Sequence, residues 1–260
     1  MAEESHNDIG SANDPELNRI PFELEEDIPG YFNIHKLKDN PDKLVREERM
    51  YNDNSYTIDR SISHYSGLRK MFYAMRDNYG IGIPDIDMVI GERRKGERRV
   101  FMVVDKIEGR NLGDFKDLSD DEKEKFEIFY VGILQSIFDS YKNGKPFFND
   151  AHTGNIRYGH KSKEKGNVGE NYFLIDVGDA FVYEEDRSYN TKFFANIIAM
   201  MDTTAYGEEE RFKKPIVFGK IRSKLREIWE YCETNRSEEV KKYLKHNANN
   251  SGILENFLNK

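Results

Sequence analysis

Apolar residues along this chain follow two different spacings, which predict different secondary structures in its two halves. Between residues 62 and 79, apolar residues recur with the spacing of one face of an α-helix. The large apolar side chains on one face of this helix are Ile62, Tyr65, Leu68, Met71, Phe72, Met75 and Tyr79. Gly80, Gly82 and Pro84 follow directly and are expected to end the helix.

Short runs rich in β-branched and aromatic residues surround this helix and predict strands. They cover residues 31–37, 43–46, 86–90 and 100–104. Lys38–Asp42 is expected to form the turn between the first two strands, and the charged segment Gly91–Arg99 the turn between the last two. Residues 105–113 are expected to be a connector.

Helical patterns dominate after residue 113. Ser119 and Glu122 have the spacing of a capping box, and the helix that they open should end at Asn143-Gly144. Further helices are expected over residues 191–201, 216–234 and 238–258. A strand pair over 156–158 and 172–175 interrupts them, and its charged connection, residues 161–170, is expected to be exposed.

This separation of strands from helices predicts an α+β protein with two lobes. The predicted domains are an acidic mobile tail (1–20), a small N-terminal lobe with an antiparallel sheet and one helix (21–104), a hinge (105–113) and a larger helical C-terminal lobe (114–260). A ligand cleft between such lobes is the default expectation.

The composition argues against several classes of protein. A formal net charge of −8 disfavours a general nucleic-acid binder, and the basic residues between Arg93 and Arg99 are interpreted as part of a solvated turn. Cys232 is the one cysteine, so no internal disulfide can form, and it is expected to be structural. No apolar stretch reaches the ~18 residues of a membrane span, and the acidic N-terminal residues lack the apolar core of a signal peptide. We therefore expect a cytoplasmic protein, of unpredicted oligomeric state.

Two short segments carry the candidate chemistry. Asp150 is followed five residues later by Asn155, and an apolar run ending in Asp176-Val177-Gly178 comes twenty-one residues after Asn155. In a phosphotransfer site, the first Asp accepts a proton from the attacking hydroxyl, while the Asn and the second Asp bind Mg²⁺ on the phosphates of ATP. The alternative is that both acids are ordinary exposed loop residues.

These segments resemble the protein-kinase-like superfamily, and most closely its aminoglycoside phosphotransferase and choline kinase branch. Asp150-Ala151-His152-Thr153-Gly154-Asn155 is similar to the Asp-x-His-x-Gly-Asn of that family. Ile175-Asp176-Val177-Gly178-Asp179 is similar to its Ile-Asp-Phe-Gly-Asp/Glu, and the run from Val103 to Leu112 resembles its lobe-junction strand followed by Gly-x-x-Leu. Gly82-Ile83-Pro84 resembles the Gly-Ile-Pro that often precedes it.

The resemblance implies a role for each matched residue. Asp150 would orient and deprotonate the acceptor hydroxyl, and His152 would orient the loop. Asn155 and Asp176 would bind Mg²⁺, one of the two implied cofactors.

The second implied cofactor is ATP. Backbone groups of Asp105 and Ile107 would hydrogen-bond the adenine. Arg46 is the first candidate for contact with the α- and β-phosphates, and Lys43 is the second.

The chain departs from the family pattern in four places. Phe148-Asn149 replaces the His-Gly before the catalytic Asp, and Val177 replaces an aromatic residue. Gly30 alone stands where a Gly-rich phosphate loop would be. The helix over 62–79 has no central Glu to pair with Arg46, and Asp59 and His64 are the nearest candidates.

Three functions are compatible with these features. The first is ATP- and Mg²⁺-dependent transfer of phosphate to the hydroxyl of a small molecule, which the Asp-x-His-x-Gly-Asn form favours. The second is an atypical Ser/Thr protein kinase, although no Ala-Pro-Glu follows Asp176. The third is a pseudokinase that binds nucleotide or a protein partner without turnover. The acidic chain would suit a cationic acceptor, with the candidate pocket acids Glu184, Glu185, Asp186 and Asp202.

Overall fold

The computed structural model describes residues 24–27, 34–37, 40–47, 58–94, 97–111, 118–164, 169–178, 180–211 and 219–259. Contacts divide the chain into two compact units, and neither unit is one continuous stretch. The sheet unit comprises the chain up to Tyr73 together with Pro84–Glu108 and His160–Val168. The helical unit comprises Ala74–Ile83, Gly109–Gly159 and Gly169–Lys260.

This division differs from the contiguous lobes expected over 21–104 and 114–260. Residues 74–83 cluster with the helical unit, and residues 160–168 cluster with the sheet unit. The expected tail over residues 1–20 lies outside the described residues. The predicted α+β class is confirmed, with an antiparallel sheet in the N-terminal part and helices dominating the C-terminal part.

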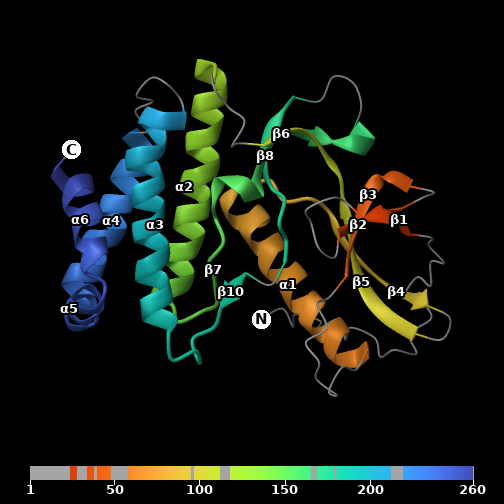
Figure 1. The fold of residues 1–260 in the computed structure, drawn as a ribbon, viewed down its shortest axis with the longest axis horizontal. Coiled ribbons are helices and arrows are strands. Elements are labelled where there is room, and N and C mark those ends of the chain that lie inside the picture. Colours follow the sequence, from red (N-terminus) through yellow and green to blue (C-terminus); the bar gives the residue numbers. More distant parts are fainter. Residues whose placement is uncertain are drawn as a thin grey trace, which may run out of the picture. The chain divides into compact units, whose positions relative to one another are not determined.

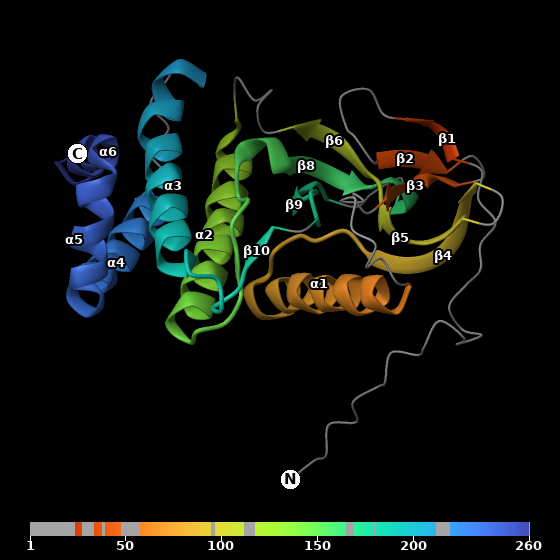
Figure 2. The same ribbon diagram turned by 60° about the horizontal axis from the view of Figure 1, so that its bottom comes forward.

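A five-stranded antiparallel sheet forms the sheet unit, in the order β1-β2-β3-β5-β4 (Figure 2). Its strands are β1 (Leu24–Asp27), β2 (Ile34–Leu37), β3 (Asn40–Glu47), β4 (Ile86–Arg94) and β5 (Glu97–Asp105). Cross-strand pairs such as Val45 with Val103 and Val89 with Phe101 place apolar side chains on one face. These four side chains and Leu37 form a buried cluster there.

The strands run further than the sequence pattern indicated. Strand β1 was not predicted, and β3 begins at Asn40, inside the expected turn. Strands β4 and β5 extend into the segment predicted to be a long turn, and Arg99 is buried in β5 rather than solvated. Strand β6 (Ile107–Asn111) lies in the expected connector, where a short strand without clear alternation gave no signal.

The predicted helix over 62–79 is confirmed as α1 (Ile58–Tyr79). It ends at Gly80, whose φ of 68° is the left-handed conformation that glycine adopts most easily. In the sheet unit, the Tyr73 hydroxyl donates to the carbonyl of Ile86 at 3.2 Å and accepts from its N–H at 2.9 Å. This double contact fixes the helix to the start of β4.

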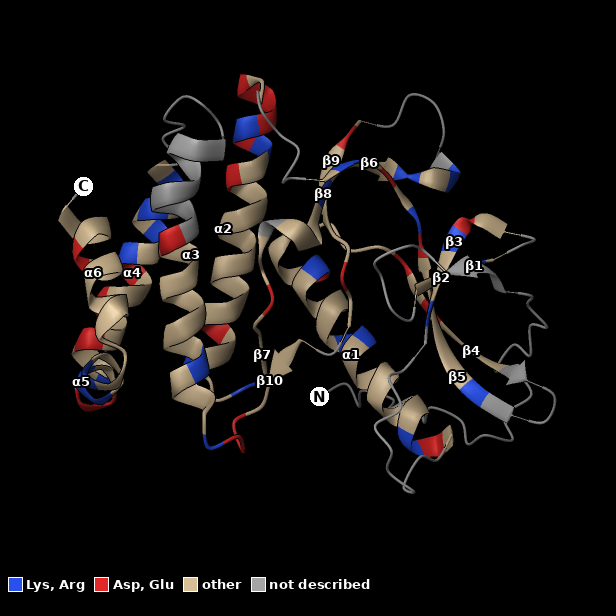
Figure 3. Ribbon diagram, viewed as in Figure 1, with Lys and Arg blue, Asp and Glu red and all other residues tan. Residues whose placement is uncertain are grey.

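Five helices of the helical unit lie alongside one another (Figure 1). They are α2 (Asp120–Lys142), α3 (Tyr189–Arg211), α4 (Gly219–Asn235), α5 (Ser237–His246) and α6 (Ala248–Asn259). The capping box that opens α2 is confirmed, because Ser119 and Glu122 each accept the other's backbone N–H. Acidic residues fill its first turn (Figure 3), where their negative charge interacts favourably with the positive end of the helix dipole. The single helix predicted over 238–258 is wrong, since the chain breaks at Asn247 between α5 and α6.

Aromatic side chains fill the core between these helices. The rings of Tyr141 and Phe193 stack with centroids 3.6 Å apart, and Phe194 packs edge-on against Trp229. One turn after Trp229 lies Cys232, and burial raises the pKa of its thiol to about 12. The thiol is therefore protonated at neutral pH, in agreement with the structural role predicted for it.

No helix in the described ranges is long and apolar enough to cross a bilayer.

Candidate active site

The loop that carries Asp150 is anchored on both sides by backbone contacts. Strand β7 (Phe147–Phe148) pairs antiparallel with β10 (Phe181–Val182), and just beyond it the Asn149 N–H donates to the Ala180 carbonyl at 2.8 Å. From α3, the side-chain amide of Asn196 donates to the Phe148 carbonyl at 3.2 Å. These contacts anchor the loop at Phe148-Asn149, where the resembling family has His-Gly.

Within this loop, the side chain of Asn155 holds Asp150. Asn155 is buried, and its Nδ2 donates to the backbone carbonyl of Asp150 at 3.1 Å and to its Oδ2 at 2.7 Å. Both amide protons are thereby used, and no described residue donates to Asn155 Oδ1. The Asp150 side chain keeps 39% of its surface exposed, so a second molecule can reach the carboxylate.

His152 lies between Asp150 and the turn that follows it. Its Nδ1 accepts the Gly154 N–H at 3.1 Å, which in the neutral ring places the proton on Nε2. Nε2 lies 3.4 Å from Asp150 Oδ1, a long contact. The expectation that His152 orients the loop therefore has a geometric basis in its two contacts.

Asp176 is brought to the same loop by the neighbouring strands. Strand β8 (Ile156–Lys161) pairs antiparallel with β9 (Asn171–Leu174), with Ile156 opposite Leu174. Directly after β9, the Ile175 N–H donates to the Asn155 carbonyl at 2.8 Å, which sets Asp176 beside Asn155. Asp176 Oδ1 accepts the Gly178 N–H at 3.2 Å, a tight turn of the kind expected for Asp-x-Gly.

The ligand chemistry of this pair fits a hard cation. The carboxylate of Asp176 and the Oδ1 of Asn155 are oxygen donors, and Mg²⁺ is usually held by one or two carboxylates together with substrate phosphates and water. No group of three or more His, Cys, Asp or Glu gathers as a metal site in the described ranges. The pair differs from such a group because one of its two ligands is an amide.

The two candidates for phosphate contact project from opposite faces of the sheet. Lys43 and Arg46 are three residues apart in β3, and side chains alternate along a strand. Lys43 Nζ lies 2.6 Å from Asp105 Oδ1 and 3.5 Å from Asp87 Oδ2, so Lys43 already holds two acids. Arg46, opposite Met102, stays the preferred candidate, and its acidic partner stays a prediction.

The backbone around Asp105 is largely occupied by its neighbours. The Asp105 N–H donates to the Asp85 carbonyl at 3.0 Å, and the Lys106 N–H donates to the Asp42 carbonyl at 2.9 Å. The Lys106 carbonyl accepts the Ser162 N–H at 2.9 Å. If a base binds to Asp105 and Lys106, the Asp105 carbonyl is therefore the group that would meet it. The predicted part of Ile107 stays a prediction.

Sequence reasoning missed Ser162 and its flanking lysines. Residues 161–170 were expected to be exposed, which is wrong for the segment that contacts Lys106, because Ser162 is only 2% exposed. The partners of this segment lie far away along the chain, and no local pattern marks them. Gly30, Leu112 and Asp179, which entered the resemblance, lie outside the described residues.

Of the acids expected to line an acceptor pocket, Asp186 is already engaged. Lys192 Nζ lies 2.5 Å from its Oδ2, and the hydroxyl and N–H of Ser188 donate to its Oδ1. Hydrogen bonds from Lys192 and Ser188 lower the pKa of this carboxyl below its usual range. The parts of Glu184, Glu185 and Asp202 in acceptor binding stay predictions.

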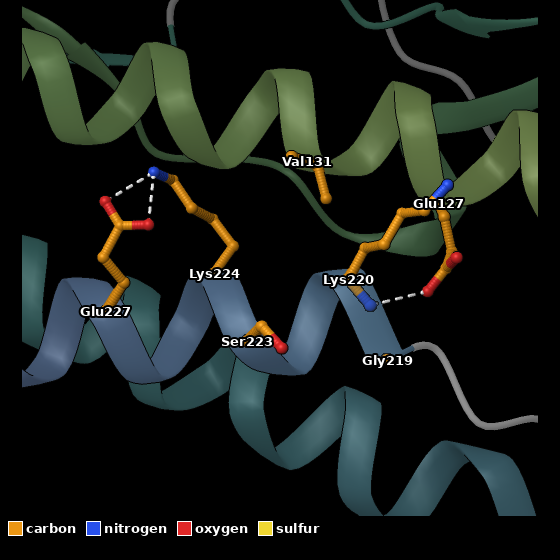
Figure 4. Close-up of a pocket in the computed structure, with 7 residues that line it drawn as sticks. All are labelled: Glu127, Val131, Gly219, Lys220, Ser223, Lys224 and Glu227. Carbon is orange, nitrogen blue, oxygen red and sulfur yellow. Dashed lines mark hydrogen bonds and ion pairs between the residues drawn. The ribbon is translucent and has the colours of Figure 1, made fainter.

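A shallow groove between α2 and α4 has a volume of about 520 Å³ (Figure 4). It is lined by Glu127, Val131, Gly219, Lys220, Ser223, Lys224 and Glu227. The Glu127 carboxylate accepts the backbone N–H of Lys220, and the Lys224 ammonium pairs with the Glu227 carboxylate. None of the candidate catalytic residues lines this groove, so it is separate from the candidate active site.

Comparison with known proteins yields little sequence similarity. No protein-family model matches the chain, and no curated protein matches it. Among solved structures, a GDP complex of a point mutant of aminoglycoside 2′-phosphotransferase-IIIa is similar at 10% identity and a TM-score of 0.35, over 94% of this chain and 95% of that one. At this identity and TM-score, the similarity assigns neither activity nor residues to this chain.

Proposed function

We propose that this chain is an ATP- and Mg²⁺-dependent phosphotransferase that moves the γ-phosphate to a hydroxyl of a small molecule. One observation carries the proposal. The side chain of Asn155 holds Asp150 and its carbonyl holds the residue before Asp176, so the three residues expected to act together are tied to one loop. Two isolated loop acids would have no reason to share this link.

The transfer step assigns one task to Asp150. The acceptor oxygen forms a bond to the γ-phosphorus while the bond between that phosphorus and the β–γ bridging oxygen breaks, and ADP leaves with the electron pair. The proton of the acceptor hydroxyl passes to the Asp150 carboxylate. The hydrogen bond from Asn155 orients that carboxylate, and its exposed surface admits the acceptor. Positioning of this kind supplies much of the rate enhancement in phosphoryl transfer.

Asn155 and Asp176 are the residues that would hold Mg²⁺, which when bound neutralises charge on the β- and γ-phosphates. The amide of Asn155 is suited to this task because its protons are directed to Asp150, which leaves Oδ1 as an acceptor. The Asp176 carboxylate is held by the Gly178 N–H.

The test measures Mg²⁺-dependent release or transfer of phosphate from γ-labelled ATP. Wild type is compared with Asp150→Asn and Asp176→Ala, and with Asp121→Asn as a control that removes an exposed acid of α2. We expect slow hydrolysis by wild type and by the control, and a loss of about 10²–10⁴-fold in Asp150→Asn. An acceptor screen then begins with cationic small molecules, because the chain is acidic.

Other outcomes separate the competing functions. Thermal stabilisation by ATP and Mg²⁺ without turnover, even in the presence of candidate acceptors, would identify a pseudokinase. Transfer to protein hydroxyls but to none of the small molecules would identify an atypical protein kinase. If the protein shows neither turnover nor thermal stabilisation, that result would contradict nucleotide binding by this chain.

A further inference from the structure

We propose that three consecutive residues, Lys161, Ser162 and Lys163, position the Asp105–Lys106 backbone so that it selects adenine over guanine. We name these three residues the hinge brace. This inference rests on the proposed function, since it concerns the nucleotide of that same reaction. The hinge brace and the residues that it contacts all belong to the sheet unit.

The first support is a set of short contacts around Ser162. Its N–H donates to the Lys106 carbonyl at 2.9 Å, and its hydroxyl donates to Asp42 Oδ1 at 2.5 Å. The carbonyl of Asp42 in turn accepts the Lys106 N–H. Ser162 thus closes a ring of hydrogen bonds that leaves Lys106 no backbone group for a ligand.

The second support is the charge arrangement around Asp105, whose side chain is only 1% exposed. Its Oδ1 lies 2.6 Å from Lys43 Nζ, and its Oδ2 lies 2.7 Å from Lys163 Nζ and 4.0 Å from Lys161 Nζ. No described residue donates to either oxygen with hydrogen-bond geometry, so the buried charge depends on these ammonium groups. A buried carboxylate is costly without such compensation, which ties Asp105 to the hinge brace.

Asp85 completes the arrangement. Its Oδ2 lies 3.0 Å from both Lys161 and Lys163, and its backbone carbonyl accepts the Asp105 N–H. Burial on its own would raise the pKa of Asp85, but hydrogen bonds and attraction from the two lysines outweigh it and lower the pKa to about 2. The close ion pair with Asp105 and the hydrogen bond to Asp85 raise the pKa of the Lys163 ammonium. At neutral pH the Asp85 carboxylate and the Lys163 ammonium are therefore both charged.

The consequence concerns which base the backbone accepts. With the Asp105 N–H and both Lys106 groups used, the Asp105 carbonyl is the acceptor that these residues present. Adenine has an amino group at its C6 position that can donate to a carbonyl, whereas guanine has an oxygen there that cannot. A backbone held in this arrangement should favour ATP over GTP.

The test compares dissociation constants for ATP and GTP, measured by calorimetry with Mg²⁺ on the full chain. The variants are Lys163→Met, Ser162→Ala and the charge-preserving Lys163→Arg, with Lys125→Met as a control for an exposed lysine that holds a surface ion pair. We expect Lys163→Met to weaken ATP binding about tenfold. The dissociation constants for ATP and GTP should become more similar in this variant than in wild type. Lys163→Arg should restore the ratio, and kcat at saturating ATP should change less than KM.

Failure of the inference can be told from failure of the proposed function. In one outcome, wild type prefers ATP, and Lys163→Met and Ser162→Ala melt at lower temperature but keep the wild-type ratio of the ATP and GTP dissociation constants. That outcome would show that the hinge brace is only structural. A wild-type protein that binds ATP and GTP equally would also overturn the inference while leaving phosphotransfer intact. Absence of nucleotide binding by wild type would overturn both. Should Lys163→Met not fold, Ser162→Ala decides, because it keeps every charge.

Discussion

Asp150 and Asp105 are two carboxylates of one chain that the structure treats in opposite ways. Asp150 is held by the neutral amide of Asn155, faces the ring of His152, and keeps 39% of its side chain exposed. Asp105 is 1% exposed and is surrounded by three ammonium groups. One carboxylate is oriented but left available, and the other is fully compensated by charge.

The difference shows how environment assigns roles to identical side chains. A general base must reach the proton that it accepts, so full burial among cations would be incompatible with the role proposed for Asp150. A carboxylate that fixes a backbone must not be released, so exposure would weaken Asp105. Substitution at the first should therefore cost activity, and substitution at the second should cost stability.

The largest effect on stability is expected for Asp105→Asn. Removing this charge leaves Lys43 and Lys163 close together without compensation, and breaking a buried ion pair costs about 3–5 kcal/mol. Urea unfolding followed by circular dichroism measures the loss. Asp87→Asn is the matched control, because Asp87 is 63% exposed and its pair with Lys43 is worth at most about 1 kcal/mol. Equal losses of unfolding free energy in the two variants would contradict the structural role assigned to Asp105.

Next in size is the effect of Asn155→Ala on catalysis. It removes the amide that holds Asp150 and a ligand expected for Mg²⁺, so we expect a rate loss of about 100-fold, which corresponds to about 2.7 kcal/mol. The control is Asn196→Ala, which removes a similar bond to the Phe148 carbonyl but no expected ligand. If both variants lose the same activity, Asn155 supports only the shape of the loop.

A smaller effect concerns the pH dependence of stability through Asp85. Its pKa is lowered from 3.8 to about 2, so the stability that it contributes is present above the unfolded-state value and is lost as pH falls through about 2. Because the side chain is 35% exposed, solvent screening reduces this contribution to about 1 kcal/mol. The gap in urea midpoint between wild type and Asp85→Asn should therefore close between pH 4 and pH 2. A gap that does not change with pH would contradict the ion pairs with Lys161 and Lys163.

The smallest effect sharpens the comparison most. Asp150→Asn should change the free energy of unfolding by no more than about 0.5 kcal/mol, because the residue is partly exposed and carries no buried charge pair. Urea unfolding of this variant, beside its lost turnover, tests the assignment of roles. A loss of several kcal/mol would mean that Asp150 is part of the architecture.

Local signals in the sequence were enough to predict many of the elements. The Ser119 capping box and Asn143-Gly144 marked both ends of α2, and Gly80 marked the end of α1. The candidate loop from Asp150 to Asn155 could be singled out because its residues are close in sequence and their hydrogen bonds span only a few positions. Such features depend on neighbours that the sequence places side by side.

Long-range features escaped prediction for the opposite reason. The charges of Lys161 and Lys163 predicted exposure to solvent. Their partners Asp85 and Asp105 lie far away along the chain, so the sequence gives no sign of these ion pairs. The break at Asn247 was hidden since the helical pattern continues on both sides of it. The opposite directions of Lys43 and Arg46 follow from strand alternation alone, whereas the ion pair between Lys43 and Asp105 could not be predicted because Asp105 belongs to another strand.

The core of the helical unit also determines which spectroscopic signals can report these effects. Trp229 is the single tryptophan and Cys232 the single cysteine, and both are buried in α4. Tryptophan fluorescence and thiol labelling would therefore follow the opening of the helical unit and give little signal from the sheet unit that contains Asp105. If the two units melt separately, fluorescence would record Asp105→Asn as harmless while circular dichroism records the loss. Agreement between the two signals would show that the chain unfolds as one cooperative whole.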